Sequence, residues 1–121
     1  AKERIEKNPV SKSTVIVTGN GDSLCYDLLS AQYFYSDIDK IRRAETILNK
    51  RMLQENYISV DDYWDELGID KRPATEDDMG WTIDKDGWIE FYFTYEAADD
   101  GRPCIVVHVE QPPRYDYSKF A

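Results

Sequence analysis

The segment from Trp88 to Tyr95 constrains the fold most strongly, because its hydrophobicity alternates with a period of two. One set of positions is apolar or aromatic and the other is mixed: Ile89, Phe91, Phe93 and Tyr95, then Trp88, Glu90, Tyr92 and Thr94. Successive side chains of a β-strand point to opposite faces of a sheet, so this pattern predicts a strand. The turn-like residues 84–87 separate it from apolar residues 80–83, and we therefore predict a hairpin of residues 80–83 and 88–95.

Further strands are expected on both sides of this hairpin. Residues 104–109 are apolar and end at Pro112-Pro113, which completes a C-terminal antiparallel meander of residues 80–83, 88–95 and 104–109. Near the other end, the β-branched residues 14–18 precede Gly19-Asn20-Gly21 and predict a strand followed by a tight turn. Residues 24–26 and 32–35 predict a second short pair, although residues 28–30 are equally compatible with a helical turn.

Two helices are predicted between these groups of strands. Ser36 with Asp39 three residues later is a capping pattern, and the helix that it starts should run over about residues 37–53. Its apolar stripe recurs at helical spacing through Ile38, Ile41, Ala44, Leu48 and Met52, with Ile47 beside it. Ser59 with Asp62 repeats the capping pattern for a helix over residues 60–67, which Gly68 ends. The sequence therefore predicts an α+β fold.

The length of 121 residues suits one domain of this kind. Residues 1–13 alternate in charge and offer little to bury, so we expect a linker or the end of a preceding helix there, and a single α+β domain over residues 14–121.

The net charge of −9 is concentrated in the middle of the chain, where residues 55–100 hold three Lys or Arg and fifteen Asp or Glu. Nucleic-acid binding is disfavoured, because phosphate neutralisation needs Lys and Arg at the surface. The longest apolar run is Ile105–Val107, which is far short of the ~20 residues that span a bilayer, so we expect no membrane insertion by this chain.

Catalytic and metal-binding patterns are weak. Cys25 and Cys104 are expected to be buried free thiols, with a disulfide between them as the alternative. His108 shares a strand face with Cys104, but no third group that would orient a nucleophilic pair is evident. Residues 82–89 resemble the middle of a calcium loop, yet Thr82 and Phe93 stand where its terminal carboxylates belong, so we expect no metal.

A cofactor is not expected either, because Gly19-Asn20-Gly21 lacks the third glycine of a dinucleotide fingerprint and has Leu24 in its place. These absences favour a non-enzymatic role. A small metal-dependent or Cys/His-based enzyme, built around His108, Cys104 and the many acids, remains the alternative.

The aromatic content is the most informative functional signal, with nine Tyr, three Trp and four Phe. Exposed Tyr and Trp side chains are enriched at the centres of protein interfaces. We predict a protein partner or self-association through Trp88, Tyr92 and Tyr63, beside the acidic surface of residues 55–100.

The order of these segments resembles an uncharacterised family of bacteriophage and prophage proteins. The resemblance covers roughly Val15 to Tyr117 and is carried by residues 33–36, 41–45, 48–51, 56–69, 80–81, 100–105 and 112–113. It implies no known activity. Members of that family often carry an N-terminal hydrophobic segment followed by a charged helix, so Ala1–Asn8 would be the end of that helix and a membrane anchor would precede this chain.

The function predicted from the sequence is therefore a phage- or prophage-encoded interaction module, either a virion or assembly component or a factor directed at a host protein. Its expected location is the bacterial host cytoplasm or the virion, with membrane anchoring in the full-length protein as a further option.

Overall fold

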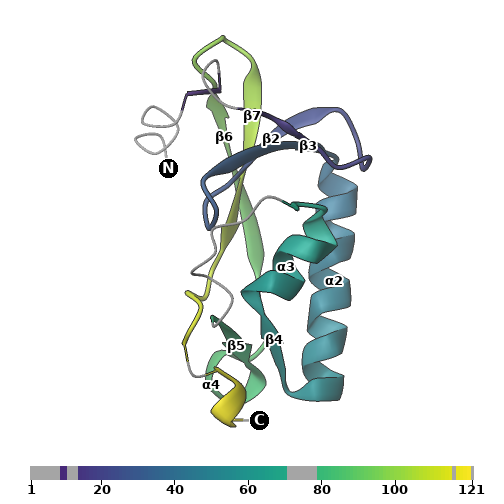
Figure 1. The fold of residues 1–121 in the computed structure, drawn as a ribbon, viewed down its shortest axis with the longest axis vertical. Helices are drawn as coiled ribbons and strands as arrows, with labels where there is room; N and C mark the ends of the chain where they lie inside the picture. Colours follow the sequence, from purple (N-terminus) through teal and green to yellow (C-terminus); the bar gives the residue numbers. More distant parts are fainter. Residues whose placement is uncertain (1–8, 11–13, 71–78, 116, 121) are drawn as a thin grey trace.

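The structure, a computed structural model, describes residues 9–10, 14–70, 79–115 and 117–120. Figure 1 shows a strongly twisted main sheet with helices and a small second sheet beside it. In chain order the elements are β1 (Ile16–Val17), β2 (Ser23–Asp27), β3 (Gln32–Ser36), α2 (Ile38–Glu55), β4 (Tyr57–Ser59), α3 (Val60–Leu67), β5 (Gly80–Thr82), α4 (Ile83–Asp86), β6 (Phe91–Ala97), β7 (Pro103–Val109) and the 3₁₀ helix η3 (Tyr117–Phe120). The predicted α+β class is confirmed.

The main sheet has the strand order β1-β3-β2-β7-β6. The hairpins β2–β3 and β6–β7 are antiparallel, whereas β1 lies parallel to β3 and β2 lies parallel to β7. The central β2–β7 pairing sets Cys25 opposite Ile105, and it joins the N-terminal hairpin to the C-terminal one. Strand β6 consequently forms one end of the sheet.

Helix α2 begins one residue later than the capping pattern predicts. Ser36 is the last residue of β3, where it pairs with Ser23, and Asp37 is the N-cap: its side chain accepts from the backbone N–H of Asp39. The prediction of Ser36 as the cap was wrong, because strand pairing holds that residue in the sheet. The expected buried stripe is present in Ile41, Ala44, Leu48 and Met52.

Three polar side chains of α2 hold the backbone of residues 89–91, where β6 begins, against the helix. The Asn49 side-chain amide donates to the Ile89 carbonyl and accepts from the Ile89 N–H, both at 2.9 Å. One turn earlier, Glu45 accepts from the Phe91 N–H at 2.6 Å, and Arg42 donates to the Phe91 carbonyl at 3.1 Å. These side chains satisfy backbone groups that no strand pairs with, and they hold residues 89–91 against the helix.

Helix α3 follows the prediction closely. The Ser59 hydroxyl accepts from the Asp62 N–H at 2.9 Å, while the Asp62 carboxylate accepts from the Ser59 N–H at 3.0 Å. This reciprocal pair is a capping box, and Gly68 ends the helix in the left-handed conformation that it adopts easily.

The predicted hairpin of residues 80–83 and 88–95 is wrong. β5 pairs instead with β4, and residues 83–86 form the short helix α4 rather than a β-turn. Asp86 stabilises that helical turn, because its carboxylate accepts from the Thr82 N–H and pairs with Arg114 at 3.0 Å. A Cβ on Gly80 would clash with the Ile58 carbonyl oxygen, so only glycine permits this close pairing of β4 with β5.

The core lies on both faces of the main sheet. One large cluster packs α2, α3 and the β4–β5 pair against one face, with Trp64, Trp81, Leu48 and Phe34 fully buried. The opposite face carries a smaller cluster that includes Tyr26, Tyr33, Cys104 and Val106, with Val10 buried against it. Among the described residues, no helix is long and apolar enough to cross a membrane.

A buried carboxylate joins α3 to the β2–β3 turn. Asp27 is fully buried and accepts from the Tyr63 hydroxyl at 2.7 Å, the Trp64 indole N–H at 2.9 Å and the Ser30 hydroxyl at 2.6 Å. Its oxygens also accept from the backbone N–H groups of Leu29 and Ser30. A buried charge is stable only when its lone pairs are satisfied in this way.

We predict that Asp27→Asn lowers the free energy of unfolding by about 3 kcal/mol, since the asparagine NH2 group would face donors and leave them unpaired. Urea denaturation monitored by tryptophan fluorescence measures this change. Asp22→Asn, at an exposed carboxylate, is the control and should shift stability by less than about 0.5 kcal/mol. Equal midpoints for the two variants would contradict the assigned role of Asp27.

Candidate functional site

The outward face of the β6–β7 hairpin, opposite α2, presents the aromatic side chains expected at an interface. Strand alternation places Phe91 and Val107 in the core beneath the helices, so Tyr92, Thr94 and His108 point to the other face. We call this surface, together with the exposed Trp88 that precedes β6 in the chain, the aromatic face.

The aromatic face is held in place by specific contacts. The rings of Tyr92 and His108 stack with centroids 4.4 Å apart and an interplanar angle of 11°. The His108 Nε2 atom lies 2.8 Å from the Thr94 hydroxyl oxygen, and partial burial lowers the pKa of His108. The shift favours the neutral form of the imidazole.

Trp88 precedes β6 and is fixed through its backbone. Its carbonyl accepts from the Gln111 side-chain N–H at 2.7 Å, and the Gln111 oxygen accepts from the Glu90 N–H at 3.1 Å. Trp88 is 53% exposed and Tyr92 is 44% exposed. Glu90 lies between these aromatic residues in the sequence, and its carbonyl accepts from the Glu110 N–H at 2.8 Å. Both glutamates are exposed and add negative charge here.

Tyr63 does not belong to this surface. Its side chain is fully buried, its hydroxyl donates to Asp27, and its ring contacts Trp81 and Phe91 edge to face. Burial, together with the charge of Asp27, raises the pKa of Tyr63 well above its usual value. The expectation that Tyr63 contacts a partner is corrected accordingly: the helical pattern that places Tyr63 on α3 also turns it inward.

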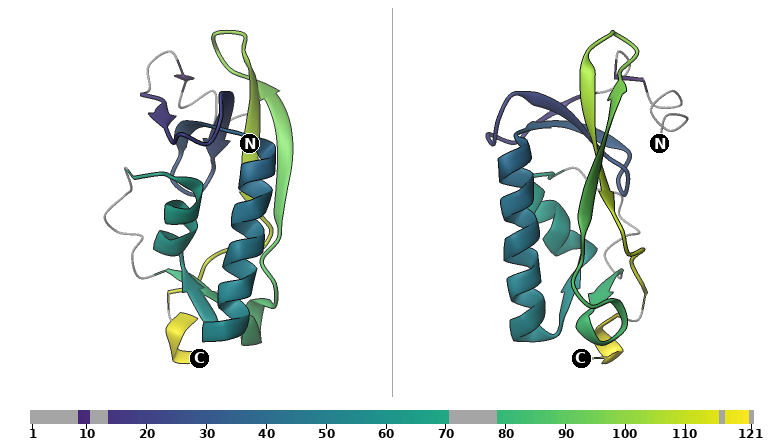
Figure 2. Two further views of the ribbon diagram at one scale, coloured as in Figure 1. Left: turned by 90° about the vertical axis from the view of Figure 1, so that its right-hand side faces the viewer. Right: turned by 180° about the vertical axis from the view of Figure 1, so that it is seen from behind.

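Tyr95 is an exposed aromatic residue that the sequence pattern misassigned. The alternation of β6 places it with Ile89, Phe91 and Phe93, yet it is 67% exposed. Figure 2 shows the reason, since the β6–β7 hairpin projects beyond the N-terminal end of α2, so that helix does not cover its tip. No sequence signal marks this point, because it depends on where the helix begins relative to the strand.

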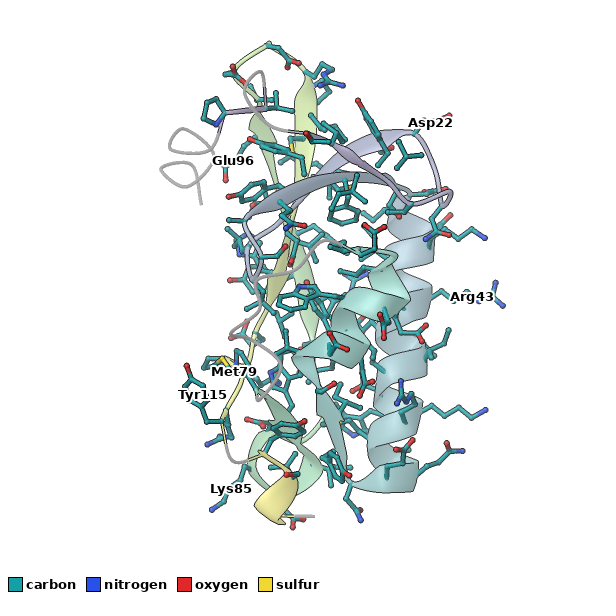
Figure 3. The ribbon with its side chains drawn as sticks, in the orientation of Figure 1. Asp22, Arg43, Met79, Lys85, Glu96 and Tyr115 are labelled. Atoms are coloured by element: carbon teal, nitrogen blue, oxygen red, sulfur yellow. The ribbon has the colours of Figure 1, made fainter. Side chains whose placement is uncertain are left out.

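A groove of about 370 Å³ lies at this tip, where β2 and β7 begin side by side. Tyr95, Ile105 and Pro103 provide apolar lining, and Asp22 and Arg102 provide charges. Arg102 is held by Asp100 at 2.8 Å and by the Tyr35 hydroxyl at 2.9 Å. Figure 3 shows Asp22 and Glu96 on opposite sides of this upper part of the molecule. The lining of this groove combines apolar side chains with one acidic and one basic side chain, a mixture that suits a peptide side chain better than a charged metabolite.

A smaller groove of about 210 Å³ lies where α2, α3 and the β1–β2 connection meet, lined in part by Lys40, Arg43 and Glu66. Arg43 projects away from the protein body in Figure 3. The smaller groove is lined by two basic side chains and one acidic side chain, so it presents no concentrated charge of one sign.

The candidate nucleophiles are not assembled into a reactive group. Cys25 and Cys104 are both free and buried, which confirms the expected thiols. They belong to different core clusters on opposite faces of the sheet, which explains why they do not form a disulfide. Burial raises the pKa of each thiol to about 12, so both remain protonated and unreactive near neutral pH.

Metal-binding residues do not cluster within the part of the chain that the structure describes, where no group of three or more His, Cys, Asp or Glu is placed to hold an ion. In the segment that resembles a calcium loop, Asp86 is engaged by Arg114 and by the Thr82 N–H, while Asp84 is exposed on α4.

Comparison with known proteins assigns the chain to a family without assigning an activity. Residues 1–118 match DUF6353, which is described as a family of unknown function. The chain belongs to this family. No curated protein matches the chain, and no solved structure does. The site in this DUF6353 member therefore has to be interpreted from its own geometry.

We predict that neither cysteine reacts with a disulfide reagent such as DTNB at about pH 8 in the native state, because both thiols are protonated and shielded. Unfolding in guanidinium chloride should release both for reaction. A thiol that reacts in the native protein as fast as it does in the unfolded chain would contradict the buried positions.

The raised pKa values also predict a loss of stability at alkaline pH. The unfolded chain releases each thiol proton near its ordinary pKa of about 9, whereas the folded chain holds it to about 12. Between these values the folded state binds more protons, so stability falls as the pH rises through this range. Denaturation midpoints against pH measure the effect, and Cys25→Ala with Cys104→Ala should make the slope shallower.

Proposed function

We propose that this chain is a non-enzymatic protein-interaction module, encoded by a bacteriophage or prophage, whose aromatic face binds a partner protein. The exposure of Trp88, just before β6, and of Tyr92, on β6, supports the proposal most directly. Such side chains bring large apolar area to an interface at low entropic cost. The phage origin rests on the resemblance described above, and the role would be that of a virion or assembly component or of a host-directed factor.

The charge around the aromatic face defines the partner. Glu90 and Glu110 are exposed beside Trp88 and Tyr92, and the whole chain carries a net charge of −9. A partner with a basic, partly apolar patch would be attracted over a distance by the charge and retained by contact with the aromatic rings. The host cytoplasm and the virion are the locations that suit this role.

The packing of His108 supports an interface role. Its ring packs on Tyr92, and its Nε2 atom is engaged by Thr94. The two thiols are protonated, which leaves no activated nucleophile for a Cys/His mechanism.

The test is affinity capture from a bacterial host lysate, followed by binding kinetics with the identified partner. Trp88→Ala and Tyr92→Ala should each increase the dissociation rate roughly tenfold or more, as truncation of an interface hot spot does. Leu53→Ala is the matched control, since Leu53 on α2 is 55% exposed but points away from the aromatic face. Added salt should slow association, because it screens the attraction between opposite charges.

Circular dichroism confirms that each variant is folded before kinetics are compared. Unchanged dissociation rates for both aromatic variants, or a strongly acidic partner, would show that the proposed surface is wrong.

A further inference from the structure

Within the described residues, strand β6 ends the main sheet with an unpaired backbone edge. No described strand pairs with its outer side. The Glu110 N–H donates to the Glu90 carbonyl, so alternation directs the backbone groups of Tyr92, Thr94 and Glu96 toward β7. Those of Phe91, Phe93, Tyr95 and Ala97 therefore point outward.

The length of this free edge is set by its surroundings. Arg42 and Glu45 of α2 occupy the outward groups of Phe91. At the other end the chain turns after Ala97, where the Ala98 N–H donates to the Arg102 carbonyl. Three residues, Phe93, Tyr95 and Ala97, thus keep outward N–H and C=O groups that no hydrogen bond within the described structure satisfies.

In the part of the chain that the structure describes, residues 93–97 of this edge show none of the features that usually prevent strand addition. Proteins protect edge strands with proline, lysine, a bulge or a covering element. β6 has the sequence Phe-Tyr-Phe-Thr-Tyr-Glu-Ala, with one charged residue, and it pairs with β7 without interruption from Phe91 to Ala97. Its upper half also extends beyond the end of α2 (Figure 2).

We infer that two copies of this chain associate through this edge, with their β6 strands antiparallel and a two-fold axis at Tyr95. Tyr95 then exchanges N–H···O bonds with Tyr95 of the second copy, and Phe93 exchanges them with its Ala97. All three outward-facing residues are satisfied by one register, and the two sheets become continuous. The inference goes beyond the proposed function, since it uses the backbone edge rather than the aromatic face.

The side chains fit this register. Phe93, the largest on the edge, lies opposite Ala97, the smallest, and Thr94 lies opposite Glu96, so no like charges meet directly. Arg42, whose guanidinium lies 4.7 Å above the Phe93 ring and is half exposed, faces the turn that carries Asp99 and Asp100 in the second copy. The two-fold axis repeats this opposite-charge contact on both sides.

Sedimentation velocity over a range of concentrations tests the dimer. The wild-type protein should shift from 14.1 kDa toward twice that mass at micromolar to submillimolar concentrations. Tyr95→Pro removes an outward N–H that β7 does not use, and Ala97→Lys places a charge opposite Phe93, so both should remain monomeric. Val17→Lys, on the edge strand β1 where Val17 is 78% exposed, is the matched control and should dimerise normally.

A cross-linking experiment tests the register. Under mild oxidation Tyr95→Cys should form a disulfide-linked dimer, because facing residues of a hydrogen-bonded pair lie about 5.5 Å apart between Cα atoms. Ala97→Cys should not, since each Ala97 lies about 13 Å along the strand from its counterpart. The native thiols are buried and should not interfere.

Each outcome is decisive when circular dichroism shows folded variants. A monomeric wild type at submillimolar concentration would overturn the inference, as would a dimer that persists in both Tyr95→Pro and Ala97→Lys. Equal cross-linking of Tyr95→Cys and Ala97→Cys would overturn the register. None of these results depends on Trp88. If the dimer is not found, the proposed binding of a partner protein by the aromatic face is still tested separately by the Trp88→Ala and Tyr92→Ala variants.

Discussion

The carboxylate of Asp27 organises the fold around a single buried charge. It lies at the end of β2, and its donors come from the β2–β3 turn and from Tyr63 and Trp64 of α3. The whole length of α2 separates the β2–β3 turn from α3 in the sequence. The hydrogen bonds to Asp27 therefore fix the position to which the chain returns after α2. An apolar residue could not specify the same arrangement, because burial alone has no direction.

A second polar connection works at the other end of α2. Asn49, Glu45 and Arg42 bind the backbone of residues 89–91, and this contact supports the rigid start of β6. The aromatic face therefore rests on a strand that is held from beneath by side-chain hydrogen bonds as well as by packing. The same contacts occupy the outward backbone groups of Phe91. The position of α2 therefore determines how many residues of β6 keep an unpaired edge.

Local patterns predicted the elements better than their partners. The stripe on α2, the capping box at Ser59 and the strands of β6 and β7 follow from spacing and propensity, which act within a few residues. The pairing of β5 with β4 did not follow, because it depends on a close approach at Gly80 and on the Asp86–Arg114 contact. The burial of Tyr63 and the exposure of Tyr95 did not follow from the sequence for a similar reason, because exposure depends on the position of neighbouring elements.

The parallel pairing of β2 with β7 also bears on how the chain folds. Cys25 and Ile105 come from opposite ends of the sequence, so the centre of the main sheet closes only after most of the chain is available. Contacts of this kind raise the contact order, and closing so long a loop is slow. During synthesis the β2 edge of the β2–β3 hairpin stays unpaired until β7 has been made. In that interval this edge is open to pairing with strands of other chains.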